Sequence, residues 1–300
     1  MKKRADIKIG YQCNNKCKFC VQGNKREHLP NKSTKEVKRS IRQARKTCED
    51  MVFTGGEATL REDFLELVRY AKELSYRNIQ IQTNGRMFAY EKFCKEVIAA
   101  GATEFSPAVH GHKAEIHDYL TDSKGSFDQT IKGIKNLKQL KQRVLTNTVV
   151  TAHNYEYLPE VAKLLIELGV DQYQFAFVHI TGTAWENKDW IVPRLKKAMK
   201  YIKKGLDIGI KARKSVMTEA IPYCLMKGYE QYIAEKIIPS SMVIEYKKTI
   251  KSYEKYRAEE GKTKRDKCED CRYFSACEGP WREYPDMFGW TEFIPVKKKK

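Results

Sequence analysis

Between residues 6 and 213 the sequence alternates short β-type runs with amphipathic helical runs, and this alternation restricts the fold more than any other feature. Strands that alternate with helices form parallel sheets whose crossover connections are right-handed. Because the six strand–helix units are short and regular, we predict an α/β fold, a partial (β/α)6 barrel with parallel strands. The expected strands are Ile7–Tyr11, Met51–Thr54, Ile79–Thr83, Glu104–Val109, Val144–Val150 and Gln172–Val178, and Ile208–Ala212 fits a further short strand.

The rest of the chain, residues 214–300, has a different character. It is rich in Lys, Tyr, Pro and Cys, and only Gly228–Lys236 and Lys247–Glu259 carry weak helical patterns. A segment of this size buries little apolar surface, and small domains are often held together by a metal centre. We therefore predict two domains, with the barrel in residues 1–213 and a small Cys-rich domain with a basic tail in residues 214–300.

Seven of the nine cysteines fall into two groups. The first group is Cys13, Cys17 and Cys20, the second is Cys224, Cys268, Cys271 and Cys277, and the two others, Cys48 and Cys94, read as buried apolar side chains. The N-terminus lacks the apolar stretch of a signal peptide, and no apolar run is long enough to span a membrane. An odd cysteine count without an export signal favours metal ligands over disulfides, so we expect a cytoplasmic protein without a membrane partner.

The first cysteine group has the spacing C-x3-C-x2-C and follows the first expected strand. Three thiolates on one short loop can hold three irons of a [4Fe–4S] cluster and leave the fourth iron open. An open coordination site allows a metal centre to bind a substrate. Zinc is the alternative, but structural zinc needs four ligands, and only His28 lies near enough in the sequence to be a fourth.

The second group contains Cys224 and a C-x2-C-x5-C motif from Cys268 to Cys277. Four cysteines can ligate one [4Fe–4S] cluster completely, and they can equally form a four-cysteine zinc site. A fully ligated centre would carry electrons or hold the domain together.

Polar and glycine motifs follow several of the expected strands. Gly55, Gly56 and Glu57 follow the second strand, Asn84 the third and His110 the fourth, while Asn147 lies on the fifth. In a parallel barrel the functional residues gather at the C-terminal ends of the strands. These residues are therefore candidates for a common site, although a plain turn would also explain Asn84, and an ordinary strand-end histidine would explain His110.

The cysteine loop, with Phe19 directly before its last cysteine, resembles the signature of the radical S-adenosylmethionine (SAM) superfamily. The resemblance implies that Cys13, Cys17 and Cys20 ligate the cluster and that its open iron chelates the amino and carboxylate groups of SAM. It also implies that Phe19 borders the adenine and that Gly55, Gly56 and Glu57 serve the methionyl amine. It implies that Asn84, His110 and Asn147 lie near the cofactor, although Ala108 and His110 replace the Ser and Asp that many relatives carry.

The C-terminal motif resembles the centre of the SPASM motif found in radical SAM maturases. Four residues after Cys277, where that motif has its next cysteine, this chain has Trp281. The resemblance therefore implies the truncated, twitch-like form, with a single auxiliary [4Fe–4S] cluster on Cys224, Cys268, Cys271 and Cys277.

The resemblance implies an enzyme that cleaves SAM reductively to a 5′-deoxyadenosyl radical, which then removes a hydrogen atom from a substrate. Peptide or protein maturation is our first expectation, although the barrel begins at residue 6 and leaves no room for an N-terminal leader-binding domain. Modification of RNA or a nucleotide is the second expectation, and modification of a small-molecule cofactor precursor is the third. A non-catalytic iron–sulfur or zinc protein that binds nucleic acid is an alternative from another class.

The formal net charge of +19 bears on the partners. It favours an acidic or phosphate-bearing partner, although lysines spread over solvated helix faces would also explain it. Reductive cleavage further implies an electron donor, such as a ferredoxin or a flavodoxin.

Overall fold

The computed structural model describes residues 3–297, and a nine-stranded sheet forms its centre. The strands are β1 (Lys3–Gly10), β2 (Asp50–Gly55), β3 (Asn78–Thr83), β4 (Glu104–Pro107), β5 (Arg143–Val150), β6 (Gln172–Phe177), β7 (Ser215–Glu219), β8 (Ser240–Ile244) and β9 (Thr249–Ile250). Their order in the sheet is β7-β6-β5-β4-β3-β2-β1-β8-β9. All neighbours are parallel except β8 and β9, which pair in antiparallel fashion.

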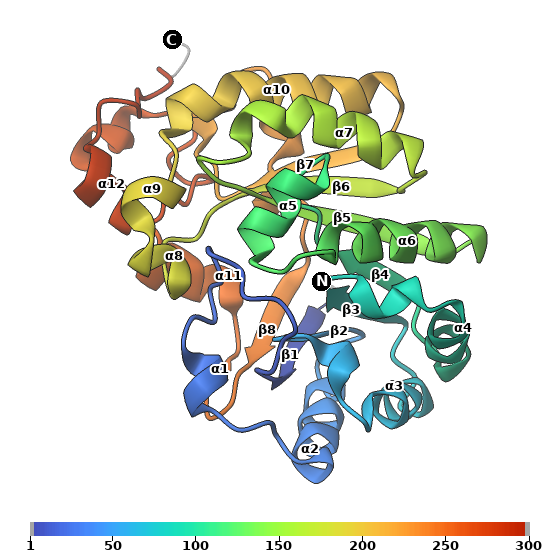
Figure 1. Ribbon diagram of the computed structural model, residues 1–300. Helices are drawn as coiled ribbons and strands as arrows, with labels where there is room; N and C mark the ends of the chain where they lie inside the picture. Colours follow the sequence, from blue (N-terminus) through green and yellow to red (C-terminus); the bar gives the residue numbers. More distant parts are fainter. Residues whose placement is uncertain (1–2, 298–300) are drawn as a thin grey trace.

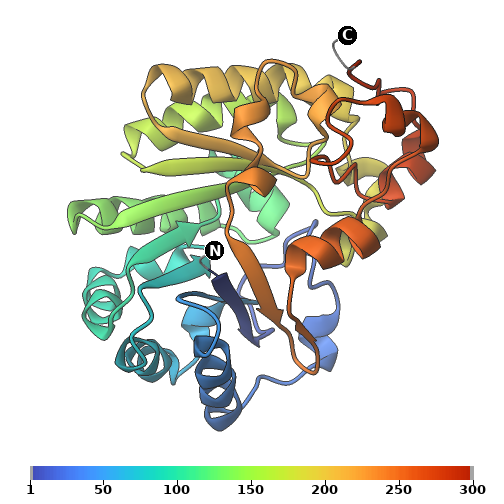
Figure 2. The same ribbon diagram turned by 180° about the vertical axis from the view of Figure 1, so that it is seen from behind.

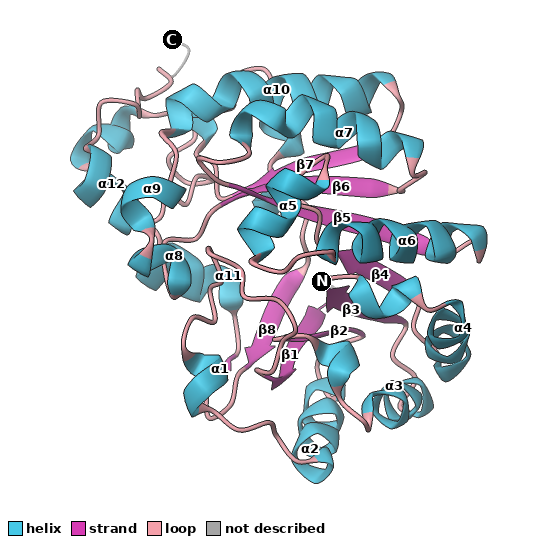
Figure 3. Ribbon diagram, in the orientation of Figure 1, coloured by secondary structure: helices cyan, strands magenta, loops and turns pink. Residues whose placement is uncertain are grey.

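Long helices cover the outer face of this curved sheet (Figure 1; Figure 3). They are α2 (Thr34–Arg45), α3 (Phe64–Glu73), α4 (Glu91–Ala100), α6 (Ser126–Gln139), α7 (Leu158–Glu167) and α10 (Leu195–Lys211). The shorter helices lie in the connections, and they are α1 (Lys25–His28), α5 (Ala114–Thr121), α8 (Thr183–Glu186), α9 (Lys188–Ile191), α11 (Tyr253–Tyr256) and α12 (Glu283–Phe288).

The sequence explains how the two faces of the sheet differ. On β1, Ala5 and Ile7 are fully buried, whereas the alternating residues Arg4, Asp6 and Lys8 are half-buried. Side chains alternate between the two faces of a strand, so the apolar residues pack under the helices and the polar ones point to the other side. We call this other side the inner face. The same alternation continues on β3, β5 and β6.

The six strands predicted from the sequence are all present, but the expected short strand at Ile208–Ala212 is wrong. The first four of these residues belong to α10, which continues to Lys211 with Leu206 and Gly209 on its buried side, and Ala212 is the C-cap of the helix. The chain then turns at Arg213, whose φ is +55°, and the strand after it is β7. The error arose because a short run with β-branched residues at the end of an amphipathic helix fits both patterns.

The sheet continues beyond residue 213. β7 pairs with β6, and β8 pairs with β1 from Lys3↔Ser240 to Ile7↔Ile244. Figure 2 shows β8 beside β1, with the Cys-rich end of the chain next to the barrel. The division into domains at residue 213 stays a prediction, and three strands from the part of the chain after it, β7, β8 and β9, extend the sheet of the barrel. Within residues 3–297, no helix has the length and apolar composition needed to cross a membrane.

Candidate iron–sulfur and SAM site

The first cysteine loop leaves the C-terminal end of β1 and is fixed by backbone hydrogen bonds. The amides of Lys16 and Lys18 donate to the carbonyls of Thr121 and Leu120, at 2.9 and 3.0 Å. On the other side, the side chain of Asn187 donates to the carbonyl of Lys18 at 2.8 Å. Segments after β4 and β6 therefore hold the loop, and Figure 1 shows α5 and α8 next to it.

The three thiols of this loop, Cys13, Cys17 and Cys20, lie near enough to one another to interact through their charges. Each cysteine is half-buried. Burial raises the pKa of the Cys17 thiol, and the charges of Cys20 and Cys13 raise this pKa further. Burial likewise raises the pKa of Cys13. Three soft donors that repel one another as thiolates fit a cationic iron–sulfur centre, because its charge would compensate theirs.

Gly55, the last residue of β2, and Gly56, which follows it, allow the end of β2 to approach the start of the cysteine loop. The amide of Gly56 donates to the carbonyl of Gly10 at 2.9 Å, and the amide of Glu57 donates to the carbonyl of Gln12 at 2.7 Å. A Cβ atom on Gly56 would lie 2.2 Å from the Gln12 carbonyl oxygen. Gly55 adopts a φ of +129°, and a Cβ atom there would lie 2.2 Å from the oxygen of Gly10. Any larger residue at either position would push the loop away.

The carboxylate of Glu57 is 3% exposed and ties β2 to β3. One oxygen accepts hydrogen bonds from the hydroxyls of Thr59 and Thr83, at 2.6 and 2.8 Å. The other accepts a bond of 2.6 Å from the amide of Asn84. Burial raises the pKa of Glu57, although these hydrogen bonds act in the opposite direction. The contact of Glu57 with the amine of SAM stays a prediction, as do the SAM contacts of Gly55 and Gly56.

Asn84 lies directly beside the cysteine loop. The side-chain nitrogen Nδ2 of Asn84 is 2.6 Å from Oδ1 of Asn14 and 3.9 Å from Sγ of Cys13. The same side chain accepts a hydrogen bond of 3.0 Å from the amide of Arg86, as in an ordinary turn, and the contact of Asn84 with the cofactor stays a prediction.

Arg86 is a site residue that the sequence analysis missed. Its guanidinium donates to the carbonyl of Asn14 and, at 2.8 Å, to Oδ1 of Asn15. It also donates to Gln129 at 2.6 Å, which connects the loop to α6. A cationic side chain two residues after Asn84 was the available signal, because arginine is suited to holding several acceptors at once.

Phe19 and His110 pack against each other with ring centroids 4.7 Å apart in an edge-to-face arrangement. Nδ1 of His110 accepts a hydrogen bond of 3.3 Å from the amide of Val149. Burial lowers the pKa of His110 well below its usual value, so this imidazole is neutral at pH 7. The adenine contact of Phe19 and the cofactor contact of His110 stay predictions.

Asn147 lies on the inner face at the centre of β5. Its carboxamide oxygen accepts a hydrogen bond of 3.3 Å from Gln174 on β6, and its carbonyl accepts one of 3.0 Å from the amide of Val109. Asn154, in contrast, is fully buried and donates to the carbonyl of His110 at 2.9 Å. Asn154 thus fixes the backbone, whereas the cofactor contact of Asn147 stays a prediction.

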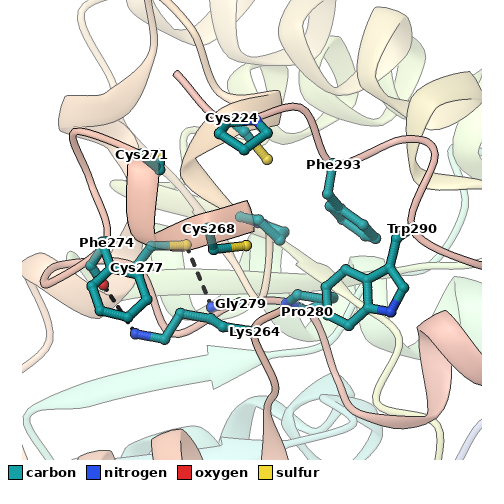
Figure 4. A pocket seen from close by; sticks show the side chains of 12 residues that line it. Cys224, Lys264, Cys268, Cys271, Phe274, Cys277, Gly279, Pro280, Trp290 and Phe293 are labelled. Carbon is teal, nitrogen blue, oxygen red and sulfur yellow. Dashed lines mark hydrogen bonds between the residues drawn. The ribbon is translucent and has the colours of Figure 1, made fainter. Parts of the chain in front are cut away.

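The second cysteine group lines one pocket near the C-terminal end of the described chain (Figure 4). Cys224, Cys268, Cys271 and Cys277 all line it, together with apolar residues such as Trp290 and Phe293. Burial and the other three cysteines raise the pKa of Cys224 to about 12. The amide of Gly279 donates to Sγ of Cys277 at 3.4 Å, and that of Val296 to Sγ of Cys271 at 3.3 Å. Backbone N–H groups that donate to cysteine sulfurs in an apolar pocket are compatible with an iron–sulfur cluster. The reduction potential of such a cluster depends on hydrogen bonds of this kind.

The remaining two cysteines follow the prediction for apolar core residues. Cys48 and Cys94 are 1% and 0% exposed. Among residues 3–297, no three Cys, His, Asp or Glu side chains converge tightly enough to bind a single metal ion. The ligands of a cluster are bound to different irons, so they are spread more widely than the ligands of one zinc ion.

Fold and site together define a class of protein, a partial barrel that carries a three-cysteine loop at the C-terminal edge of its first strand. The model of the "Radical SAM superfamily" matches residues 7–165 of this chain. The chain therefore belongs to the radical SAM superfamily, which confirms the predicted enzyme class and its two cofactors, SAM and a [4Fe–4S] cluster.

The chain resembles curated radical SAM proteins over part of their length. It is 32% identical over 174 residues to the AdoMet-dependent heme synthase of Oleidesulfovibrio alaskensis, covering 57% of this chain and 44% of the relative. It is 29% identical over 180 residues to the probable GTP 3′,8-cyclase of Saccharolobus islandicus, covering 59% and 57%. The chain thus spans about half the length of these relatives.

Solved structures confirm the fold. SuiB from Streptococcus suis bound to S-adenosylmethionine superposes with a TM-score of 0.68 at 19% identity, covering 98% of this chain and 76% of SuiB. Native anSMEcpe with bound AdoMet superposes with a TM-score of 0.69 at 16% identity, covering 98% and 93%. Both are SPASM-domain enzymes, which agrees with the resemblance noted for the C-terminal cysteines.

Proposed function

We propose that this chain cleaves SAM reductively and uses the resulting radical to remove a hydrogen atom from a peptide or protein. The observation that carries the proposal is the grouping of Cys13, Cys17 and Cys20 on a loop fixed by α5 and α8. A [4Fe–4S] cluster bound there supplies the electron and the open iron site for SAM. The protein contributes the positioning of the loop, since Gly56, Asn84 and Arg86 each contact its backbone or side chains.

The same proposal assigns an auxiliary [4Fe–4S] cluster to Cys224, Cys268, Cys271 and Cys277. Their common pocket and the amides directed at two of the sulfurs support this assignment. With four cysteine ligands the centre has no open position. It therefore suits electron transfer or the stability of the C-terminal segment better than substrate binding.

A peptide substrate is supported by one structural neighbour, because SuiB has been solved bound to its precursor peptide SuiA. That structure superposes on this chain with a TM-score of 0.67 at 20% identity, and it covers 87% of this chain and 61% of SuiB. The second candidate is a small molecule, because the similar curated proteins are a heme synthase and a probable GTP cyclase.

The substrate class can be tested by the stimulation of SAM cleavage. The holoprotein is incubated anaerobically with SAM, dithionite and one of three pools, which contain short peptides, nucleoside triphosphates or tetrapyrroles. We expect the peptide pool to increase 5′-deoxyadenosine formation and to yield peptides altered in mass. Stimulation by either of the other pools alone would refute the peptide substrate and leave the radical chemistry intact.

A further inference from the structure

Exposed aromatic side chains lie against the first cysteine loop. Tyr119 of α5 is 44% exposed, and Trp190 of α9 is 43% exposed. The ring of Tyr119 stacks on the imidazole of His153, with centroids 4.2 Å apart, and meets the indole of Trp190 edge to face at 6.3 Å. The ammonium of Lys18, a residue of the loop itself, lies 5.0 Å from the centre of the Tyr119 ring. We call Tyr119, His153 and Trp190 the aromatic face.

The segments that carry the aromatic face are bonded directly to the loop. The amide of Thr183, at the start of α8, donates to the carbonyl of Cys20 at 3.0 Å, and α9 follows α8 at the same end of the barrel (Figure 1). A Cβ atom on Gly182 would lie 2.5 Å from the same Cys20 oxygen, so the two segments are in close contact. The amide of Lys18 donates to the carbonyl of Leu120, the residue after Tyr119. A protein bound at the aromatic face would therefore lie close to the predicted cluster ligands.

Exposed apolar side chains are concentrated in this part of the molecule. Among residues 3–297, ten large apolar side chains are at least 36% exposed. Four of the ten follow the cysteine loop or lie on α5, α8 and α9, namely Val21, Tyr119, Trp185 and Trp190. Apolar groups that are exposed together often mark contact surfaces, and Trp and Tyr are enriched among the residues that dominate the binding energy of protein interfaces. The aromatic face is thus a candidate surface for a protein partner.

The charges around the aromatic face do not favour one sign. The segments 13–28, 113–124 and 183–190 carry seven cations and six carboxylates. The cations are Lys16, Lys18, Lys25, Arg26, Lys113, Lys124 and Lys188, and the carboxylates are those of Glu27, Glu115, Asp118, Asp122, Glu186 and Asp189. The whole chain, in contrast, has a net charge of +19, which attracts an acidic protein over a longer distance. An acidic partner would be steered by the whole chain and held by the aromatic rings.

We propose that the aromatic face binds an acidic one-electron carrier protein that reduces the cluster of the first cysteine loop. This inference rests on the proposed function, because reductive cleavage consumes one electron for each SAM, and electron transfer requires close approach to the cluster. The carrier is oxidised by one electron. SAM takes up this electron by way of the cluster, and its C5′–S bond breaks to give methionine and the 5′-deoxyadenosyl radical. Interfaces of electron-transfer partners are typically small and transient, and a few exposed aromatic rings suffice for such a contact.

Binding is tested with the oxidised holoprotein by biolayer interferometry. The probes are two acidic carriers, a bacterial flavodoxin and a bacterial [4Fe–4S] ferredoxin. We expect the double variant Tyr119→Ala/Trp190→Ala to bind at least one carrier about tenfold more weakly than the wild type or worse. Tyr90→Ala is the matched control, because it removes a tyrosine that is 61% exposed next to α4, and it should bind like the wild type.

Salt tests whether the whole chain steers the carrier. Added salt should slow the association of the carrier with the wild type, because it screens the attraction between the net charges. Binding of neither carrier, equal affinity in the double variant, or association that is independent of salt would overturn the proposal.

A second measurement compares two sources of electrons. Dithionite is a small reductant that needs no docking surface, so the double variant should form 5′-deoxyadenosine with dithionite at the wild-type rate. With the reduced carrier, it should form this product about tenfold more slowly. An equal loss with dithionite would show that the two rings support the cysteine loop, and it would overturn the docking role. Carrier binding by a protein that forms no 5′-deoxyadenosine with dithionite would refute the proposed function alone.

The second cysteine group offers a rival point of entry for electrons. Ile294, between two residues that line its pocket, is 70% exposed. We expect Ile294→Ser to accept electrons from the reduced carrier as fast as the wild type. Slower transfer in Ile294→Ser, together with unchanged transfer in Tyr119→Ala/Trp190→Ala, would place the carrier at the C-terminal segment and overturn the proposal.

Discussion

Glu57 and Asn84 join the ends of β2 and β3, since the buried carboxylate of Glu57 accepts a hydrogen bond of 2.6 Å from the backbone amide of Asn84. Asn84 in turn reaches Asn14 and Cys13 with its side chain. Glu57, the last residue of the Gly-Gly-Glu motif, is thus linked to the cysteine loop by hydrogen bonds through Asn84. The same carboxylate that the family resemblance assigns to SAM also fixes the strand end that supports the first cysteine.

Replacing Gly56 with alanine should displace the cysteine loop. The new methyl group would lie 2.2 Å from the backbone oxygen of Gln12, and backbone cannot move aside cheaply. We expect a loss of about 1–3 kcal/mol in the free energy of unfolding, measured with urea, and loss of iron from the first site. The control is Gly228→Ala, at a turn with φ of +82° and open space, which should cost about 1 kcal/mol and keep its iron. Full iron content in Gly56→Ala would contradict this role.

Arg86→Gln tests the residue that holds the loop to α6. The substitution removes a charged donor from Asn14 and Asn15, and hydrogen bonds to charged groups contribute about 1.5–3 kcal/mol. We expect a chelator to remove the cluster of the first site about tenfold faster or more, as followed by visible absorbance. Lys92→Gln, which changes an exposed cation on α4, serves as the matched control and should match the wild type. Equal rates in both variants would show that Arg86 does not stabilise the loop.

Cys271→Ala should remove the iron of the second cysteine group and leave the iron of the first group in place. Cys271 lines the second pocket and accepts an amide hydrogen bond from Val296, so its loss leaves the auxiliary cluster incompletely ligated. Iron analysis should show a decrease of about four irons, with the first site retained. Cys94→Ala changes another buried cysteine, which lies outside both groups, and should keep all iron. If instead zinc replaces iron in the wild-type pocket, the auxiliary cluster is refuted.

Mild acid should destabilise the fold through buried histidines. Burial lowers the pKa of His117 to about 4, whereas the unfolded chain takes up this proton near pH 6.5. The unfolded state therefore binds more protons between these values, and stability falls as the pH is lowered through this window. His117→Gln should reduce the slope of unfolding free energy against pH by about one proton, which corresponds to about 1.4 kcal/mol per pH unit. An unchanged slope would show that His117 is already protonated in the folded state.

The sequence predicted the barrel because its signal is local and periodic. Alternating burial on β1 and β6 follows directly from alternating residue types. The short segment at Ile208–Ala212 was mispredicted, since a few apolar residues cannot distinguish the end of a helix from a strand. β8 was missed altogether because its pairing with β1 joins residues more than 230 positions apart.

The cysteines could be grouped from spacing alone, because ligands on one loop lie close together in any fold. The contacts that support them could not be found in this way. Arg86, Thr121 and Asn187 all reach the cysteine loop from distant segments. The stack of His179 on Trp281 likewise depends on how the Cys-rich segment returns to the barrel. Such pairings arise from tertiary packing and leave no periodic trace in the sequence.

The most direct test of the account is SAM cleavage by anaerobically reconstituted protein. The wild type, Cys17→Ala and the buried-cysteine control Cys48→Ala are each loaded with iron and sulfide, reduced with dithionite and mixed with SAM. The account predicts 5′-deoxyadenosine from the wild type and Cys48→Ala, and none above background from Cys17→Ala. Absence of 5′-deoxyadenosine from fully loaded wild-type protein, or equal amounts from Cys17→Ala, would contradict it.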